Sequence, residues 1–205
     1  AEYSKMVAGY EEALEILRST GSAADECAVL FALANDALQR KGDFQKAIDY
    51  LNRALFISRS KSYKNGEADA LLQLGAFYRL FDDNRKALDF YEQSVAVIKS
   101  IAPLTVLSIL KQASALNNIG NLYRGVNEDQ NITDYLTAKP AADRQKAIEY
   151  YSQALKIYRN VKTKGHRRGF TGEAETLLNI GNTHKELGNF AESLVHLTPS
   201  LTLFK

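Results

Sequence analysis

Amide side chains recur at matching positions in three stretches of this 205-residue chain. Asn118 and Asn121 lie in the middle stretch, Asn179 and Asn182 in the last, and Gln73 in the first. A side-chain amide carries a hydrogen-bond donor and an acceptor together. That pair can hold the backbone of an extended peptide without reading its side chains. Asn is a middling-to-poor helix former, so its repetition in register indicates a use in binding.

A basic residue follows the amides of each stretch, at Arg79, Arg124 and Lys185. These cations would hold an acidic side chain or a free carboxylate of the same ligand. The spacing i, i+4, i+7, i+10 places each set on one stripe of a helix. The sets are Asp69, Gln73, Ala76 and Arg79; Ser114, Asn118, Asn121 and Arg124; and Glu175, Asn179, Asn182 and Lys185.

Residues for other chemistry are scarce. The sequence has no phosphate-binding Gly loop, no paired-His zinc signature and no Cys pair. Its histidines are His166, His184 and His196, and we expect His184 to have a packing role. Cys27, on a predicted helix, is expected to be a small buried residue. We therefore predict no catalytic residue, no metal site and no cofactor, and a protein that is not an enzyme.

Two groups of cations raise the alternative of nucleic-acid binding. Each group lies near a predicted helix C-terminus, where the helix dipole favours positive charge without any ligand. No aromatic residues alternate with these cations to stack on bases, while the net charge of +2 argues neither for nor against nucleic acid. Nucleic acid is therefore the weaker hypothesis. The groups are Arg59, Lys61 and Lys64, and Lys156, Arg159, Lys162, Lys164, Arg167 and Arg168.

The amide stretches belong to an internal repeat. Residues 70–78 read ALLQLGAFY, residues 115–123 read ALNNIGNLY, and residues 175–183 read ETLLNIGNT. A second block follows each, reading KALDFY at 86–91, KAIEYY at 146–151 and ESLVHL at 192–197, with KAIDYL at 46–51 before them. Apolar residues in both blocks recur at i, i+3, i+7, the period of a helix. A repeat of this length indicates a solenoid of helix pairs.

Glycines at equivalent places in the first block indicate a close approach of the paired helices. Gly75, Gly120 and Gly181 each lie within a predicted helix. Because a mid-helix Gly costs ~1 kcal/mol relative to Ala, three in register point to a steric requirement. The second block also has small residues at equivalent positions: Ala47, Ala87, Ala147 and Ser193.

These features resemble the tetratricopeptide repeat. The resemblance rests on L-G-x-x-Y in the first helix, a turn Gly with an aromatic two residues later (Gly42 and Phe44, Gly188 and Phe190), and A-x-x-x-Y/L in the second helix. The longer spacing resembles kinesin-light-chain-like arrays and arrays attached to bacterial signalling enzymes and proteases. It implies an all-α, right-handed solenoid of antiparallel helix pairs, in which the amide stripe lines a concave groove. The chain departs from the pattern at Asn35, Asn84 and His184.

The repeats divide the chain as follows: an N-terminal helix or half repeat at 1–20, and repeats at 23–65, 66–102, 103–165 and 170–205, the last a complete or truncated copy. The third repeat carries an insertion at about 125–143, in which Ile132, Tyr135 and Leu136 are spaced for a short helix. That insertion is a tolerated surface loop or a contact arm. Pro103 is expected in the first turn of the next helix, and Pro199 is expected to kink or end the last one.

We therefore predict a cytoplasmic, non-catalytic scaffold that binds an extended peptide or partner segment in its groove. No apolar run reaches the ~18 residues of a membrane span, and no charged-then-apolar leader opens the chain. The alternative for the Asn residues is that they belong to the family pattern and bind nothing. The rival function is self-association, or regulation of a larger enzyme, through the insertion and the apolar C-terminal end at Leu201, Leu203 and Phe204.

Overall fold

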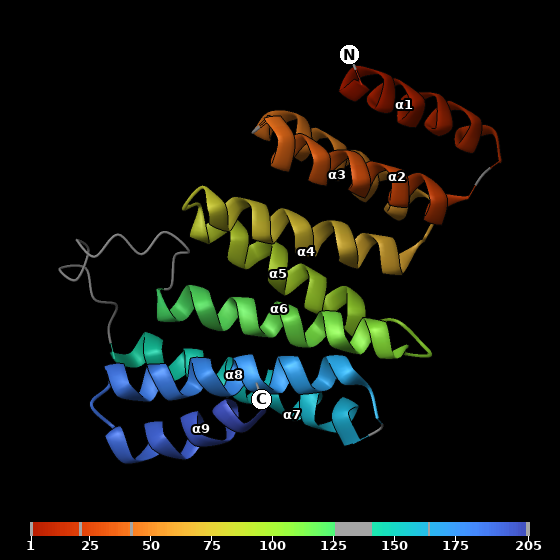
Figure 1. The fold of residues 1–205 in the computed structure, drawn as a ribbon. Helices are drawn as coiled ribbons and strands as arrows, with labels where there is room; N and C mark the ends of the chain where they lie inside the picture. The colour runs from red at the N-terminus through yellow and green to blue at the C-terminus, as the bar shows by residue number, and fades with distance from the viewer. Residues whose placement is uncertain (1, 21, 42, 126–140, 164, 204–205) are drawn as a thin grey trace.

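The structure, a computed structural model, describes residues 2–20, 22–41, 43–125, 141–163 and 165–203. Every element in these ranges is a helix. Figure 1 shows the helices stacked in chain order, from α1 at one end of the molecule to α9 at the other. The prediction of an all-α solenoid of antiparallel helix pairs is confirmed.

The helices pair in order along the chain. The first helices are α2 (Ala23–Asp36), α4 (Lys64–Leu80), α6 (Val106–Arg124) and α8 (Arg167–Glu186). The second helices are α3 (Phe44–Ser60), α5 (Asn84–Lys99), α7 (Ala141–Thr163) and α9 (Phe190–Leu203). The N-terminal helix α1 (Glu2–Thr20) precedes them, and a π-helical turn, η1 (Ala37–Lys41), extends α2.

Each second helix from α3 to α7 packs on the first helix of its own pair and on that of the next. Successive first helices also touch, α2 on α4, α4 on α6 and α6 on α8. We call the surface that these four helices share the first-helix face.

The glycines of the repeat allow the paired helices to approach. A Cβ added at Gly75 would lie 2.6 Å from the ring of Tyr91, and one at Gly120 would lie 2.5 Å from the ring of Tyr151. Both rings are fully buried. Within the fourth pair, a Cβ at Gly181 would lie 2.7 Å from Leu197. The expected steric requirement for glycine is confirmed.

In each of the last three helix pairs, a ring of the first helix stacks on a ring of the second helix at the same position of the repeat. Tyr78 stacks on Phe90 with ring centroids 5.4 Å apart, and Tyr123 stacks on Tyr150 at 5.5 Å. In the last pair His184 stacks on His196 at 5.6 Å, with the rings nearly parallel at 1°. The packing role expected of His184 is confirmed.

Helix ends follow ordinary capping chemistry. The carboxylates of Asp43 and Asp83 accept hydrogen bonds from the backbone N–H groups of Lys46 and Lys86, at 3.2 and 3.1 Å. α6 begins at Val106 rather than near Pro103, because the hydroxyl of Thr105 accepts a hydrogen bond from the N–H of Ser108 and caps it.

Pro199 does not end α9, which continues to Leu203. The proline ring removes the hydrogen bond that its position would donate to the carbonyl of Val195. The side chain of Val195 is 67% exposed, so water can reach this side of the helix. The missing bond is therefore tolerated on the exposed side.

The third pair carries the long connection. α6 is closed by Gly125, which adopts the left-handed conformation at φ 81°. α7 begins at Ala141, so Asp143 lies in its first turn. The short helix expected around Ile132, Tyr135 and Leu136 lies outside the described residues. Among the described helices, none has the length and apolar character needed to cross a membrane.

Candidate functional site

The predicted amide and basic residues lie on the first helices. α4 carries Gln73 and Arg79, α6 carries Asn118, Asn121 and Arg124, and α8 carries Asn179, Asn182 and Lys185. All are half-buried except Lys185, which is exposed. Because α6 touches both α4 and α8, the three sets belong to neighbouring helices of the first-helix face.

The amide of Asn121 is already used inside the protein. The hydroxyl of Tyr151 on α7 donates a hydrogen bond to Asn121 Oδ1 at 2.7 Å. Burial raises the pKa of Tyr151 well above its usual range despite the nearby Arg124, so this hydroxyl stays protonated and acts as a donor. Asn121 therefore helps to hold α7 on α6.

Arg124 is also occupied by internal partners. Its guanidinium donates to Glu186 Oε1 through Nε at 3.0 Å and through Nη2 at 2.6 Å. Arg144 reaches the other oxygen of Glu186 at 3.3 Å. The side chain of Arg124 is only 10% exposed. Its positive charge is thus largely neutralised by a bridge from α6 to α8.

Asn117, which the sequence patterns did not single out, links α6 to α8 between the two predicted sets. Its Oδ1 accepts hydrogen bonds from Thr176 at 3.3 Å and from the amide of Asn179 at 3.4 Å. The side chains of Asn118 and Asn182 make no hydrogen bond to any described residue. These two amides, one on each helix, are available to a ligand.

An ion pair joins α4 to α6 in the same face. Lys111 approaches Asp69 Oδ1 at 2.6 Å, and both side chains are about one-fifth exposed at 19% and 23%. Burial raises the pKa of Asp69, and the hydrogen bond and charge of Lys111 oppose that shift. Asp69, at the start of the α4 stripe, is therefore tied to the neighbouring helix.

Cations of both groups form ion pairs with buried glutamates. Arg159 and Lys162 donate to the two oxygens of Glu173 at 2.9 and 2.7 Å. Burial alone would raise the pKa of Glu173, but these hydrogen bonds outweigh it and lower the pKa.

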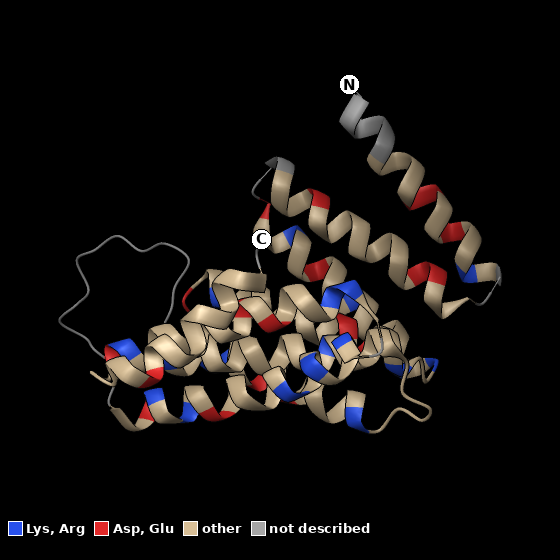
Figure 2. Ribbon diagram, turned by 60° about the horizontal axis from the view of Figure 1, so that its bottom comes forward, with Lys and Arg blue, Asp and Glu red and all other residues tan. Residues whose placement is uncertain are grey.

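Glu67 has the same arrangement one pair earlier. Arg59 and Lys64 each donate to it at 2.9 Å, and Lys61 pairs with the buried Glu26. These pairs account for most of the described cations of both groups, and Lys156, Arg167 and Arg168 remain exposed. Figure 2 shows basic and acidic residues interspersed along the helices. This distribution does not favour nucleic-acid binding.

The described residues offer neither a metal-binding group of side chains nor an activated cysteine nucleophile. No group of three or more His, Cys, Asp or Glu residues there could hold a metal ion. Cys27 is buried, its sulfur lies 3.1 Å from the hydroxyl of Ser58, and burial raises the pKa of its thiol. A buried neutral thiol is a packing group rather than a nucleophile.

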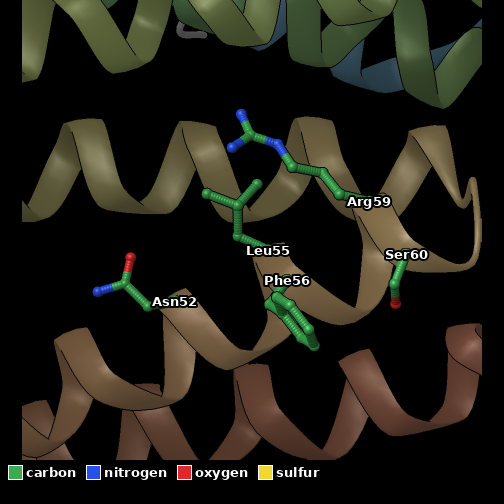
Figure 3. A pocket seen from close by; sticks show the side chains of 5 residues that line it. All are labelled: Asn52, Leu55, Phe56, Arg59 and Ser60. Carbon is green, nitrogen blue, oxygen red and sulfur yellow. The ribbon is translucent and has the colours of Figure 1, made fainter.

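Two hollows open on the first half of the solenoid. One, of about 430 Å³, lies against α3 alone. Figure 3 shows its five side chains on that helix, with Phe56 pointing away from Leu55 and Arg59. The other, of about 140 Å³, lies between α2, η1, α3 and α4 and includes Gln73 of the predicted set. We call the second hollow the α2–α4 cavity.

The last helix exposes a broad apolar surface. Phe190, Leu194, Val195 and Leu201 of α9 are 65% to 67% exposed. The residues equivalent to Leu201 in α3, α5 and α7 are Leu55, Val95 and Leu155, which are only 6% to 8% exposed. In those helices the first helix of the next pair covers the position.

Comparison with known proteins agrees with this architecture. Residues 36–100 match the sequence model of the tetratricopeptide repeat. The fold is similar to BtubC (BKLC) from P. vanneervenii, with 18% identity and a TM-score of 0.74 over 99% of this chain and 73% of that one. A kinesin-light-chain-like protein from Podospora anserina with nearly identical TPR-like repeats has 16% identity and a TM-score of 0.59, over 98% and 85%. MamA has 16% identity and a TM-score of 0.55, over 98% and 92%. No curated protein matches the chain.

Proposed function

Because residues 36–100 match the sequence model of the tetratricopeptide repeat, we propose that the chain is a non-catalytic scaffold that binds an extended peptide or partner segment along the first-helix face. Tetratricopeptide repeats are in general protein-interaction modules. The observation that carries the proposal is the pair of uncommitted amides, Asn118 on α6 and Asn182 on α8. Each can donate to and accept from the backbone of a bound segment.

The internal contacts refine which residues would meet the ligand. Asn121 and Arg124 are bound to Tyr151 and Glu186, so they support the face more than they contact a partner. A ligand carboxylate would meet Lys185, the exposed cation at the end of the α8 set. Gln73 would extend the amide row onto α4, whereas the amide of Asn179 already donates to Asn117. The scaffold would work in the cytoplasm, where the lone Cys27 stays reduced.

The experiment compares partner capture from a native lysate by the wild type and by an Asn118→Ala/Asn182→Ala variant. Each amide contributes about 1 kcal/mol through a hydrogen bond to the ligand, so we expect the partner to bind about 30-fold more weakly. Gln153→Ala/Asn160→Ala, on the exposed surface of the second helix α7, is the matched control and should capture the partner normally. A partner retained equally by all three proteins would show that the amides do not bind it.

A second candidate function, self-association, is favoured by the exposed apolar surface of α9. Burying a leucine side chain contributes about 1.5–3 kcal/mol, and α9 exposes several large apolar side chains. Sedimentation across a wide range of protein concentration measures the mass. A mass that rises with concentration, and that returns to the monomer value in Leu194→Glu/Leu201→Glu, would support self-association through α9. A constant monomer mass of the wild type would refute it.

A further inference from the structure

The α2–α4 cavity is apolar and opens on the first-helix face. Its walls include Leu38, Leu51, Ala76, Phe77 and Leu80. Asn35 and Gln73 add two amides to the lining, and the lining side chains that the structure describes carry no charge. Leu51 and Phe77 are buried, whereas Leu80 is 47% exposed. The cavity therefore has a buried apolar base, and its solvent-exposed edge carries amides.

The cavity lies where the later repeats place an aromatic ring of their own. Tyr91 and Tyr151 occupy the position of Leu51 in the second and third pairs, and both are fully buried beneath Gly75 and Gly120. The first pair has Leu51 in place of that tyrosine, and it has Leu38 where the later pairs have Tyr78 and Tyr123. Because smaller aliphatic groups replace both rings, the side chains of the first pair do not fill the α2–α4 cavity.

The apolar surface continues beyond the mouth of the cavity. Phe77, a lining residue, contacts Phe81 at 5.1 Å and Phe44 at 6.1 Å between ring centroids. Phe44 and Phe81 are 42% and 45% exposed. An apolar side chain that entered the cavity would therefore leave its neighbours in contact with two exposed rings.

We propose that the α2–α4 cavity is the anchor site of the partner segment and takes one leucine-sized apolar side chain. The proposal rests on the peptide-binding function above and adds the chemistry of the anchor. A volume of about 140 Å³ is close to the ~150 Å³ of an apolar cavity that accepts benzene. The amide of Gln73 and the NH2 group of Asn35, whose Oδ1 already accepts from Gln39 at 3.0 Å, hold the backbone on either side of the anchor.

The test uses N-acetyl-L-leucine methylamide as the probe, with N-acetyl-L-alanine methylamide for comparison. Methyl NMR follows the resonances of Leu38, Leu51, Ala76 and Leu80 during titration of the full chain. We expect saturable shifts with the leucine probe and binding at least about tenfold weaker with the alanine probe. The absence of saturable shifts, or equal binding of the two probes, would overturn the proposal.

Two variants fill the cavity from different sides. Leu38→Tyr restores from η1 one of the rings of the later repeats, and Ala76→Leu fills the space from α4, so the test survives if either fails to fold. Each should weaken binding of the leucine probe about tenfold or more. Ala96→Leu adds the same atoms on the exposed surface of α5 and should bind the probe as the wild type does. Undiminished binding by a folded cavity variant would refute the site.

The same probe separates this proposal from the general function. Saturating probe should release the partner captured from lysate. If the probe occupies the cavity and the partner stays bound, the cavity is not its anchor, while the result with Asn118→Ala/Asn182→Ala stands by itself. If that double variant captures the partner normally but the cavity variants do not, binding by the amides is refuted and the anchor-site proposal is supported.

Discussion

Gly120→Ala is the substitution for which the structure makes the sharpest prediction. The added Cβ would lie 2.5 Å and 2.6 Å from two carbons of the Tyr151 ring. That ring cannot move aside easily, because it is fully buried and its hydroxyl is bound to Asn121 at 2.7 Å. Overpacking of this kind costs about 1–3 kcal/mol, while Ala in a helix gains about 1 kcal/mol over Gly. At the upper end, which so close a contact favours, the net loss is about 2 kcal/mol.

Thermal unfolding followed by circular dichroism, supported by urea titration, measures the effect. A loss of about 2 kcal/mol lowers the Tm by about 4–8 °C in a chain of this size. The matched control is Gly9→Ala in α1, where an added Cβ meets nothing within 4 Å. There the helix propensity acts alone and should raise stability by up to about 1 kcal/mol.

A double mutant identifies the cause. Asn35 and Leu51 occupy the positions of Gly120 and Tyr151 in the first pair, so a side chain at the glycine position is compatible with leucine opposite. In a Tyr151→Leu background, Gly120→Ala should therefore be neutral or stabilising. If Gly120→Ala stabilises the wild type as Gly9→Ala does, or destabilises both backgrounds equally, the close approach of α6 and α7 through this glycine is refuted.

Three further changes test the internal contacts. Glu173→Gln removes the charge that binds two cations and should cost about 1–2 kcal/mol in urea unfolding, with a smaller loss in high salt, whereas the exposed Glu175→Gln should change little. Burial and the neighbouring histidine lower the pKa of His196, so the unfolded chain binds the proton first and stability should fall as the pH drops through 6.5. Hydrogen exchange of the α9 amides between pH 7.5 and 5.5 should show this loss, and His196→Phe should reduce it; an unchanged pH dependence would assign the effect elsewhere. Asn121→Ala leaves a buried tyrosine hydroxyl without its acceptor and should cost about 1–3 kcal/mol, whereas Asn118→Ala should stay within about 0.5 kcal/mol; equal losses would contradict the difference between the two amides.

Part of the candidate site could be read from the sequence. The i, i+4, i+7, i+10 spacing put Asn118 and Asn182 on equivalent stripes, and the structure describes both side chains as half-buried on neighbouring helices. The same spacing included Asn121 and Arg124, whose side chains are bound to Tyr151 and Glu186. Whether any of the predicted residues contacts a partner stays a prediction, which the capture experiment tests.

The cavity could not be predicted from the stripe, although one signal was present. Asn35 was visible as a departure from the glycine of the repeat. Its meaning depends on Leu51, which packs from a different helix, and on the later tyrosines that show what normally fills the space. A motif marks such a departure, but only the packing shows whether the neighbours close the gap.

The sequence by itself determined the fold class and the helix pairing. Recurring glycines, alanines and apolar residues report which face of each helix is buried, because burial repeats with the period of the helix. Only the tertiary structure decided which amide is free, which arginine is neutralised and where a cavity remains. These properties depend on contacts between residues far apart in the chain, such as Arg124 with Glu186. Periodicity along a single helix carries no information about the side chain that another helix brings to meet it.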